Sequence, residues 1–212
     1  MKKTLIIIFI AMLCVTVYNI KYTLASGSSQ YQTGDLIFQT TTSRLAPVIV
    51  AGTKSRFTHV GMIIMKNGKP YVYEASGPVG ASSFKRFVKR GVGKKFVVKR
   101  LQNELTKNQK KKLVREAYRH RGKPYDSKFL WGDKRMYCSE LVYKIYRNAL
   151  DISLSDPQKM GDLYSGVNPI VNKFAKKKYG KKLPLNETIV SPVRLYDSNM
   201  LLTVYDNYFS LN

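Results

Sequence analysis

Apolar and polar positions along the chain predict short strands and amphipathic helices. Residues 34–39 form a β-rich run entered by a turn, and a further strand is expected at residues 96–101. Between them, two β-rich runs at residues 58–65 and 71–75 flank the sequence Lys-Asn-Gly-Lys at 66–69. Asn-Gly between such runs is the strongest short-range signal for a hairpin. The two central runs are therefore expected to pair as antiparallel strands.

Helical periodicity occurs in two longer segments and one short one. Residues 106–119 are expected to form a helix capped by Thr106, and residues 44–50 a short helix that begins near Ser43. In residues 139–150 the apolar side chains recur at spacings near 3.6 and form one stripe: Leu141, Val142, Ile145 and Ala149. Gly122, Pro124 and Asp126 mark a loop between the two longer helices.

The hairpin fixes which side chains share a face of the sheet. If Asn67 and Gly68 are the turn residues, paired positions sum to 135, so that Glu74 lies opposite Gly61. His59 and Glu74 then project from one face as diagonal neighbours, at roughly 7 to 8 Å between backbones. A carboxylate there can accept a hydrogen bond from one imidazole nitrogen and fix the tautomer. A one-residue slip would place Glu74 on the other face.

Cys138 lies at or just before the start of the helix expected over residues 139–150, in the sequence RMYCSELVY. The unpaired N–H groups and the positive end of the helix dipole favour a thiolate there. The same N–H groups suit the oxyanion of a tetrahedral intermediate. Ser139 and Glu140 are interpreted as first-turn residues that complement the helix end.

The N-terminus has the order of a secretory signal peptide: two lysines, an apolar run at residues 5–17, and small or polar residues at 24–29. We expect residues 1–25 to be a signal peptide or, if uncleaved, a membrane anchor, and residues 26–212 to form a single catalytic domain. Cleavage would remove Cys14 and leave Cys138 as the only cysteine of an exported protein, periplasmic or extracellular. Such a cysteine is a reactive thiol, an intermolecular partner, or a small core hydrophobe.

The formal net charge of +24 is extreme and favours anionic partners. For an exported chain these are an anionic wall polymer or a membrane surface, whereas nucleic acid is not expected because no nucleic-acid motif is present. A solvated lysine-rich surface is the alternative. No metal or other cofactor is expected, because two histidines and one mature cysteine cannot build a typical zinc site and no nucleotide-binding loop is present.

Five motifs then carry a family resemblance. They are GDLIF (34–38), THVGMII (58–64), VYEA (72–75), KPYDSKF (123–129) and YCSELVY (137–143). In this order they resemble the YiiX/YebB-like proteins, circularly permuted members of the NlpC-type papain-like cysteine hydrolases that are related to lecithin–retinol acyltransferase. The resemblance covers residues 33–150 and leaves the role of residues 151–212 open.

The resemblance implies an α+β, circularly permuted papain-like (NlpC-type) fold: an antiparallel sheet packed against helices, with the nucleophile at a helix N-terminus. It also implies a catalytic triad in which Cys138 is the nucleophile, His59 the base and Glu74 the residue that orients the base. His120 is the competing base, but it ends a basic helix without an apparent carboxylate partner. The backbone N–H of Cys138 is expected to stabilise the oxyanion. The side chain of Tyr137 or Tyr125 is a candidate for a second hydrogen-bond donor.

These residues support an exported cysteine hydrolase that forms an acyl-enzyme. The first expectation is an amidase or peptidase acting on cell-envelope peptides of the peptidoglycan type. The second is a lipid-directed acyl hydrolase or acyltransferase. A third, from another class, is a non-catalytic envelope-binding module, which the intact set of Cys138, His59 and Glu74 argues against.

Overall fold

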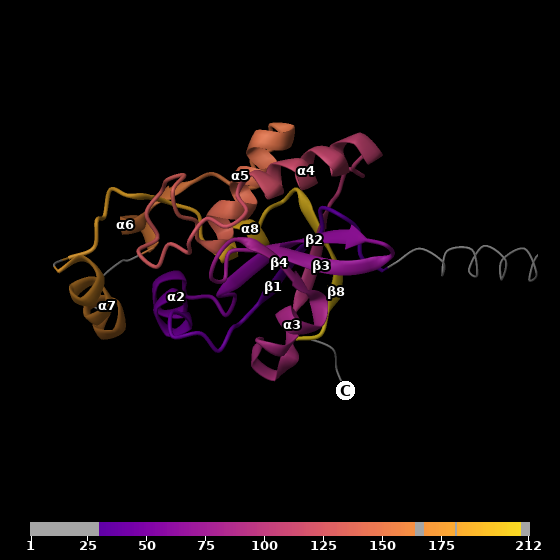
Figure 1. The fold of residues 1–212 in the computed structure, drawn as a ribbon. Coiled ribbons are helices and arrows are strands. Elements are labelled where there is room, and N and C mark those ends of the chain that lie inside the picture. The colour runs from indigo at the N-terminus through magenta and orange to yellow at the C-terminus, as the bar shows by residue number, and fades with distance from the viewer. Residues whose placement is uncertain (1–29, 164–167, 181, 209–212) are drawn as a thin grey trace, which may run out of the picture. The chain divides into compact units, whose positions relative to one another are not determined.

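The computed structural model describes residues 30–163, 168–180 and 182–208 (Figure 1). The chain divides into two units, Met1–Tyr31 and Gln32–Asn212, and the sheet and helices named below belong to the second. The signal peptide predicted at residues 1–25 lies outside the described residues. Within the described ranges, every helix is too short or too polar to cross a bilayer.

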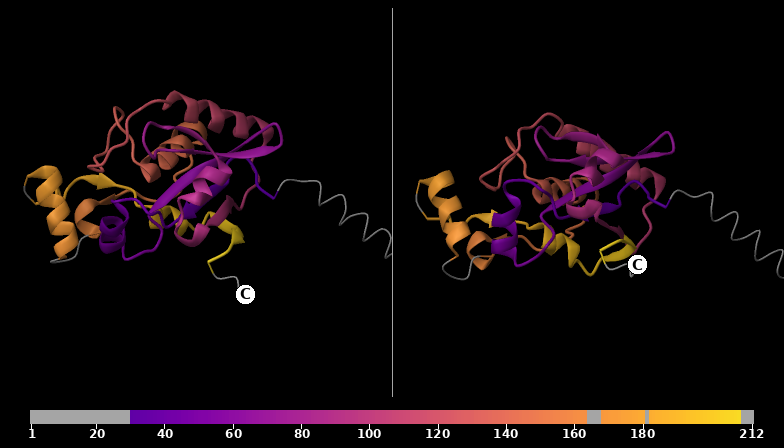
Figure 2. Two further views of the ribbon diagram at one scale, coloured as in Figure 1. Left: turned by 60° about the horizontal axis from the view of Figure 1, so that its bottom comes forward. Right: turned by 90° about the horizontal axis from the view of Figure 1, so that it is seen from below.

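A six-stranded antiparallel sheet forms the centre of the second unit (Figures 1 and 2), in the order β4-β3-β2-β1-β5-β8. The strands are β1 (Leu36–Gln39), β2 (His59–Lys66), β3 (Lys69–Glu74), β4 (Gly80–Ser83), β5 (Val97–Leu101) and β8 (Leu201–Asp206). A separate pair consists of β6 (Gln158–Lys159) and β7 (Thr188–Ile189). The edge strand β8 comes from the part of the chain beyond the family motifs, so that part belongs to the same sheet.

The helices are α2 (Ala46–Thr53), α3 (Phe84–Lys89), α4 (Lys107–Arg119), α5 (Cys138–Leu150), α6 (Met160–Leu163), α7 (Pro169–Tyr179) and α8 (Pro192–Tyr196), with a 3₁₀ turn at Val92–Lys94. The predicted Thr106 cap is confirmed, because its hydroxyl accepts a hydrogen bond from the Gln109 backbone at 3.2 Å. The short helix α2 lies two to three residues later than expected. Pro47, which lacks an N–H, stands in its first turn, where that N–H would have no helical partner.

The hairpin register deduced from Asn67 and Gly68 is confirmed. Both residues have positive φ, 50° and 72°, as a type I′ turn requires. Met62 pairs with Tyr73 and Lys66 with Lys69, so paired positions sum to 135. This places the Gly61 and Glu74 positions opposite each other.

The main hydrophobic core lies between the sheet and helices α4 and α5, which cover one face of the sheet (Figures 1 and 2). Alternate strand residues such as Phe38, Val60 and Met62 enter this core and meet Leu113 and Leu141, all fully buried. A second cluster joins the loop before α5 to the C-terminal part: Phe129, Tyr137, Met160, Phe174 and Ile189. The fold is α+β with an antiparallel sheet packed against helices, as expected.

Candidate active site

Cys138 is the first residue of α5, and its side chain is buried, with 2% exposed. Tyr137 precedes it in extended conformation, and its side chain does not cap the helix. The first N–H groups of the helix therefore have no side-chain acceptor at the N-cap and lie near the thiol. The backbone groups of Val60 and Ser139 also lower the pKa of the thiol. These donors favour the thiolate over the thiol.

His59 lies at the start of β2 and connects the thiol to a carboxylate. Its Nε2 lies 2.6 Å from Oε2 of Glu74 in a buried contact. The imidazole is also close enough to the side chain of Cys138 for each group to shift the pKa of the other. Because Nε2 of His59 contacts Glu74, Nδ1 is the ring nitrogen that can accept the thiol proton of Cys138. The Phe87 ring stacks on the imidazole with 5.6 Å between centroids, which fixes the plane of the ring.

Glu74, at the end of β3, is 2% exposed and is held by two further side chains. Ser82 donates its hydroxyl to Oε1 at 2.5 Å, and Arg90 pairs with the same oxygen through Nη2. Burial raises the pKa of the Glu74 carboxyl, but the hydrogen bond and charge of His59, together with Arg90 and Ser82, outweigh it and lower that pKa to about 2. Glu74 is therefore ionised at neutral pH.

Cys138 and His59 shift each other's pKa in opposite directions. Burial opposes charge on both groups, yet the positive charge and hydrogen bond of His59 lower the pKa of the Cys138 thiol. The thiolate and Glu74 in turn raise the pKa of His59 to about 9, against the effect of burial. The arrangement favours a thiolate–imidazolium pair at neutral pH, which is the reactive form of a cysteine nucleophile.

His120 is excluded as the competing base by its position, although not for the reason expected from the sequence. The expectation that His120 has no carboxylate partner is wrong. His120 is 4% exposed, its Nε2 lies 3.3 Å from Glu116, and its Nδ1 lies 3.0 Å from Lys123. Burial and the Lys123 charge lower its pKa. It packs at the end of α4, where Glu116 stands one turn before it.

Glu140 and Ser139 are both buried, unlike first-turn residues at an exposed helix end. Glu140 is fully buried, accepts the Gly132 N–H at 2.9 Å and pairs with Lys144 at 2.8 Å. Burial raises the pKa of its carboxyl. Ser139 donates to the Val190 carbonyl at 2.7 Å. Both residues attach α5 to surrounding loops, so the interpretation as simple dipole complements is incomplete.

Of the two tyrosines considered as oxyanion donors, Tyr125 is the better placed. The backbone of Tyr125 bridges to Met136, two residues before Cys138, and burial together with the Cys138 charge raises the pKa of its phenol far above the usual range. It therefore remains a neutral O–H donor, and its hydroxyl has no partner among the described residues. The Tyr137 hydroxyl instead accepts the Val190 N–H at 3.1 Å.

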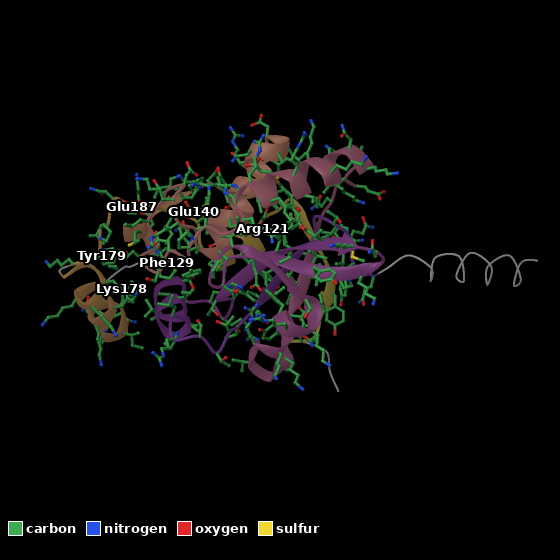
Figure 3. All side chains as sticks on the ribbon, in the orientation of Figure 1. Arg121, Phe129, Glu140, Lys178, Tyr179 and Glu187 are labelled. Atoms are coloured by element: carbon green, nitrogen blue, oxygen red, sulfur yellow. The ribbon has the colours of Figure 1, made fainter. Side chains whose placement is uncertain are left out.

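An apolar pocket opens beside Cys138. Its cavity volume is about 80 Å³, so it is a narrow apolar space beside the sulfur. Cys138 lies on its wall together with side chains from α2, the loop before α5, α6, α7 and β7, among them Ile49, Phe129, Phe174 and Ile189. Figure 3 labels Phe129, Lys178 and Tyr179 at this end of the second unit. The hydroxyl of Tyr179 donates to the Lys128 carbonyl and so links α7 to the loop that carries Phe129.

Sequence reasoning did not identify Arg90, Ser82 or the pocket wall. Arg90 follows α3 and Ser82 lies in β4, and both reach Glu74 only through the folded sheet edge. The pocket wall includes residues from α6, α7 and β7, beyond the motifs that carried the resemblance. No local pattern in the sequence marks these residues. Within the part of the chain that the structure describes, no cluster of three or more His, Cys, Asp or Glu side chains is arranged to hold a metal ion.

Comparisons with known proteins identify the family and the fold. Residues 30–205 match the model of a family described as permuted papain-like amidase enzymes, YaeF/YiiX, C92 family. The chain is 42% identical over 175 residues to the uncharacterized protein YiiX of Escherichia coli (strain K12), an alignment that covers 82% of this chain and 86% of YiiX. A crystal structure described as metalloprotein YiiX from Escherichia coli O157:H7 is similar with a TM-score of 0.81 at 43% identity, covering 84% of this chain and 99% of that one.

Proposed function

This chain belongs to the permuted papain-like amidase family, and from that premise we propose that it is an exported cysteine amidase with the triad Cys138, His59 and Glu74. The observation that carries the proposal is the buried contact of 2.6 Å between Nε2 of His59 and the Glu74 carboxylate, beside a Cys138 thiol whose pKa the same imidazole lowers. The family supports a cysteine-type amidase or hydrolase in general. The triad assignment, the export and the substrate are the parts that we propose.

The first half of the reaction forms a thioester. The Cys138 thiolate attacks the carbonyl carbon, and a C–S bond forms while the carbonyl electrons move to oxygen. The tetrahedral intermediate collapses, the bond to the leaving nitrogen or oxygen breaks, and the His59 imidazolium protonates that atom. In the second half His59 removes a proton from water, hydroxide attacks the thioester, and the acid and the Cys138 thiolate are released. An acceptor other than water would give acyl transfer.

Glu74 and the oxyanion donors act without forming bonds to the substrate carbon. Glu74 keeps Nε2 of His59 protonated and directs Nδ1 towards the sulfur, and Arg90 and Ser82 hold the carboxylate in place. The backbone N–H of Cys138 and the hydroxyl of Tyr125 are the donors that we assign to the developing oxyanion. Removing one such donor typically costs about 10²- to 10³-fold in kcat.

Two substrate classes are consistent with this chemistry. Export and the positive charge support an amide in cell-envelope peptides, which is the first candidate. A lipid-directed acyl hydrolase or acyltransferase is the second, and the apolar pocket beside Cys138 specifically favours it, because an aliphatic acyl group would be desolvated there. An anionic wall polymer or a membrane surface is the corresponding partner.

The solved relative is described as a metalloprotein. Among residues 30–163, 168–180 and 182–208, no three potential ligands from His, Cys, Asp and Glu converge on a possible metal position. The donor set therefore does not fit a resident metal ion. The proposed reaction has no metal-dependent step.

The decisive experiment combines thiol labelling with a substrate panel. Mature protein should be alkylated by iodoacetamide at Cys138 faster than a model thiol at neutral pH, and His59→Ala should slow the labelling. Wall-derived peptides and lipid amides or esters should then be incubated with wild type and Cys138→Ala, and products and the acyl-enzyme read by mass spectrometry. Labelling only after denaturation would contradict the proposal. Turnover of neither class, with retained binding to anionic envelope material, would favour a binding module.

A further inference from the structure

A second pocket lies on the His59 side of the catalytic pair and differs in character from the first. Its wall includes His59 but not Cys138, and most of its other side chains are hydroxyl-bearing or cationic: Thr41, Thr42, Ser43, Arg44, Thr58, Ser76, Arg90 and Tyr125. Ile49 of α2 contributes to the walls of both pockets. The catalytic pair therefore stands between an apolar space and a polar, cationic one.

The proposed chemistry assigns a part of the substrate to each pocket. After attack the acyl group is bonded to the sulfur of Cys138, so its chain extends into the space that Cys138 lines. The leaving atom receives its proton from His59, so the leaving group occupies the space that His59 lines. The acyl group consequently meets apolar side chains, and the leaving group meets hydroxyls and arginines.

The pocket lined by His59 contains two arginines, Arg44 and Arg90, and Glu74 pairs with one of them, Arg90. None of the described residues that line this pocket is Asp or Glu. Arg90 is already committed, since Nη2 pairs with Glu74 and Nη1 donates to Ser76 at 2.8 Å. Arg44 is exposed, and the described part of the chain contains no ion-pair partner for it. Arg44 is thus the arginine of this pocket that is available to a ligand.

We propose that this pocket binds a carboxylate or phosphate carried by the leaving group, and that Arg44 selects for that anion. The inference rests on the proposed function, because it takes the direction of the leaving group from the roles of Cys138 and His59. It defines the substrate class as an amide or ester that joins an apolar acyl group to an anionic leaving group. A guanidinium suits either anion because it can donate two parallel hydrogen bonds.

Two probes isolate the leaving-group charge: N-lauroylglycine, which is anionic, and N-lauroylglycinamide, which is neutral and otherwise alike. Binding is measured by calorimetry in the Cys138→Ala background, so that the result does not depend on turnover. We expect the anionic probe to bind about tenfold more tightly, as for a charge-assisted hydrogen bond in a partly enclosed pocket. Adding Arg44→Gln should abolish this preference, and Arg44→Lys should retain part of it. A third probe carries the same lauroyl group on a leaving group that ends in phosphate. Its affinity relative to that of N-lauroylglycine shows which of the two anions the pocket prefers.

Arg86→Gln is the matched control, because Arg86 is an exposed arginine of α3 that does not line the pocket. It makes the same change in net charge and should leave the preference intact. Equal binding of the two probes, or an unchanged preference in Arg44→Gln, would overturn the inference. Failure of the proposed function is a separate result: it would be seen as slow labelling of Cys138 and absence of an acyl-enzyme in the wild type, whatever the probes show in the Cys138→Ala protein.

Discussion

At the scale of single residues, the Glu74 carboxylate is the group on which the reactivity of the site depends most. It binds His59 through one oxygen and Ser82 and Arg90 through the other, and it is buried. Glu74→Gln keeps the shape but removes the negative charge that helps raise the pKa of His59. We expect kcat/KM to fall by about 10²- to 10⁴-fold, the contribution typical of a correctly poised general base. Circular dichroism should show that the fold is retained.

The pH profile separates this role from a purely structural one. Without the Glu74 charge the pKa of His59 falls from about 9, so the alkaline limb of the profile should move to lower pH. Glu104→Gln makes the same chemical change at an exposed position and should leave both rate and profile unchanged. Full activity of Glu74→Gln, or a lower rate with an unshifted profile, would argue against the assigned role.

The wild-type pH dependence follows from the coupled thiol and imidazole. The pKa of Cys138 is lowered, so the acid limb, along which the thiolate is lost, should lie below the usual range of a free cysteine. The pKa of His59 is raised to about 9, so the alkaline limb, along which the proton donor is lost, should lie near that value. A bell-shaped kcat/KM with a plateau through neutral pH is expected. Steady-state rates in constant-ionic-strength buffers would test it, and a rate that climbs continuously above pH 9 would contradict it.

Site residues were predicted correctly from the sequence where a local sequence signal determines their position. His59 and Glu74 were placed together from the sequence because a local signal, Asn67-Gly68, fixes a strand register that carries both. Cys138 was placed at a helix start because periodicity marks the helix that follows. The burial of His120 against Glu116 was missed, although the two are four residues apart, because the surrounding sequence is basic and suggested an exposed face.

At the scale of elements, the close approach of β2 and β3 requires a residue without a side chain at position 61. A Cβ on Gly61 would clash with a methyl of Val72 and would stand 3.4 Å from Cβ of Glu74. Gly61→Ala should therefore push β3 outwards and draw Glu74 away from His59. We expect the free energy of unfolding to fall by about 1 to 3 kcal/mol, as is typical of overpacking. We also expect kcat/KM to fall, because Glu74 would no longer contact His59.

Gly80 provides the control for this prediction in the same sheet. It pairs with Glu74 from the opposite side, on β4, and a Cβ there would meet nothing within 4 Å. Gly80→Ala should leave stability and activity nearly unchanged. Urea denaturation and kcat/KM of the two variants measure the contrast. Similar behaviour of the two variants would show that the spacing between β2 and β3 is not what positions Glu74.

Element-level prediction was limited by the absence of local signals in the C-terminal part. Strands β1, β2, β3 and β5 and helices α4 and α5 were expected close to their observed bounds, because each has its own periodicity or cap. Strand β8 was not predicted, since its identity depends on pairing with β5, about a hundred residues earlier in the chain. The same separation explains why the walls of the apolar pocket were not foreseen.

At the scale of the whole molecule, the net charge of +24 should act on encounter rather than on chemistry. Its field extends over a Debye length, about 10 Å at 0.1 M salt and about 3 Å at 1 M. The kcat/KM for an anionic substrate, or for substrate in anionic vesicles, should therefore fall steeply as salt is added. A neutral soluble substrate should show a nearly flat salt dependence, and kcat at saturation should change little for either.

Salt dependence also distinguishes the overall field from the contact proposed for Arg44. Arg44→Gln removes one charge of many, so the slope of log(kcat/KM) against log salt should stay close to that of the wild type. The preference for an anionic over a neutral leaving group at fixed salt should nevertheless disappear, because that preference depends on the direct contact with Arg44. If the preference instead vanished from the wild type at high salt and was unaffected by Arg44→Gln, the anion would be recognised by the surface charge of the whole protein rather than by this pocket.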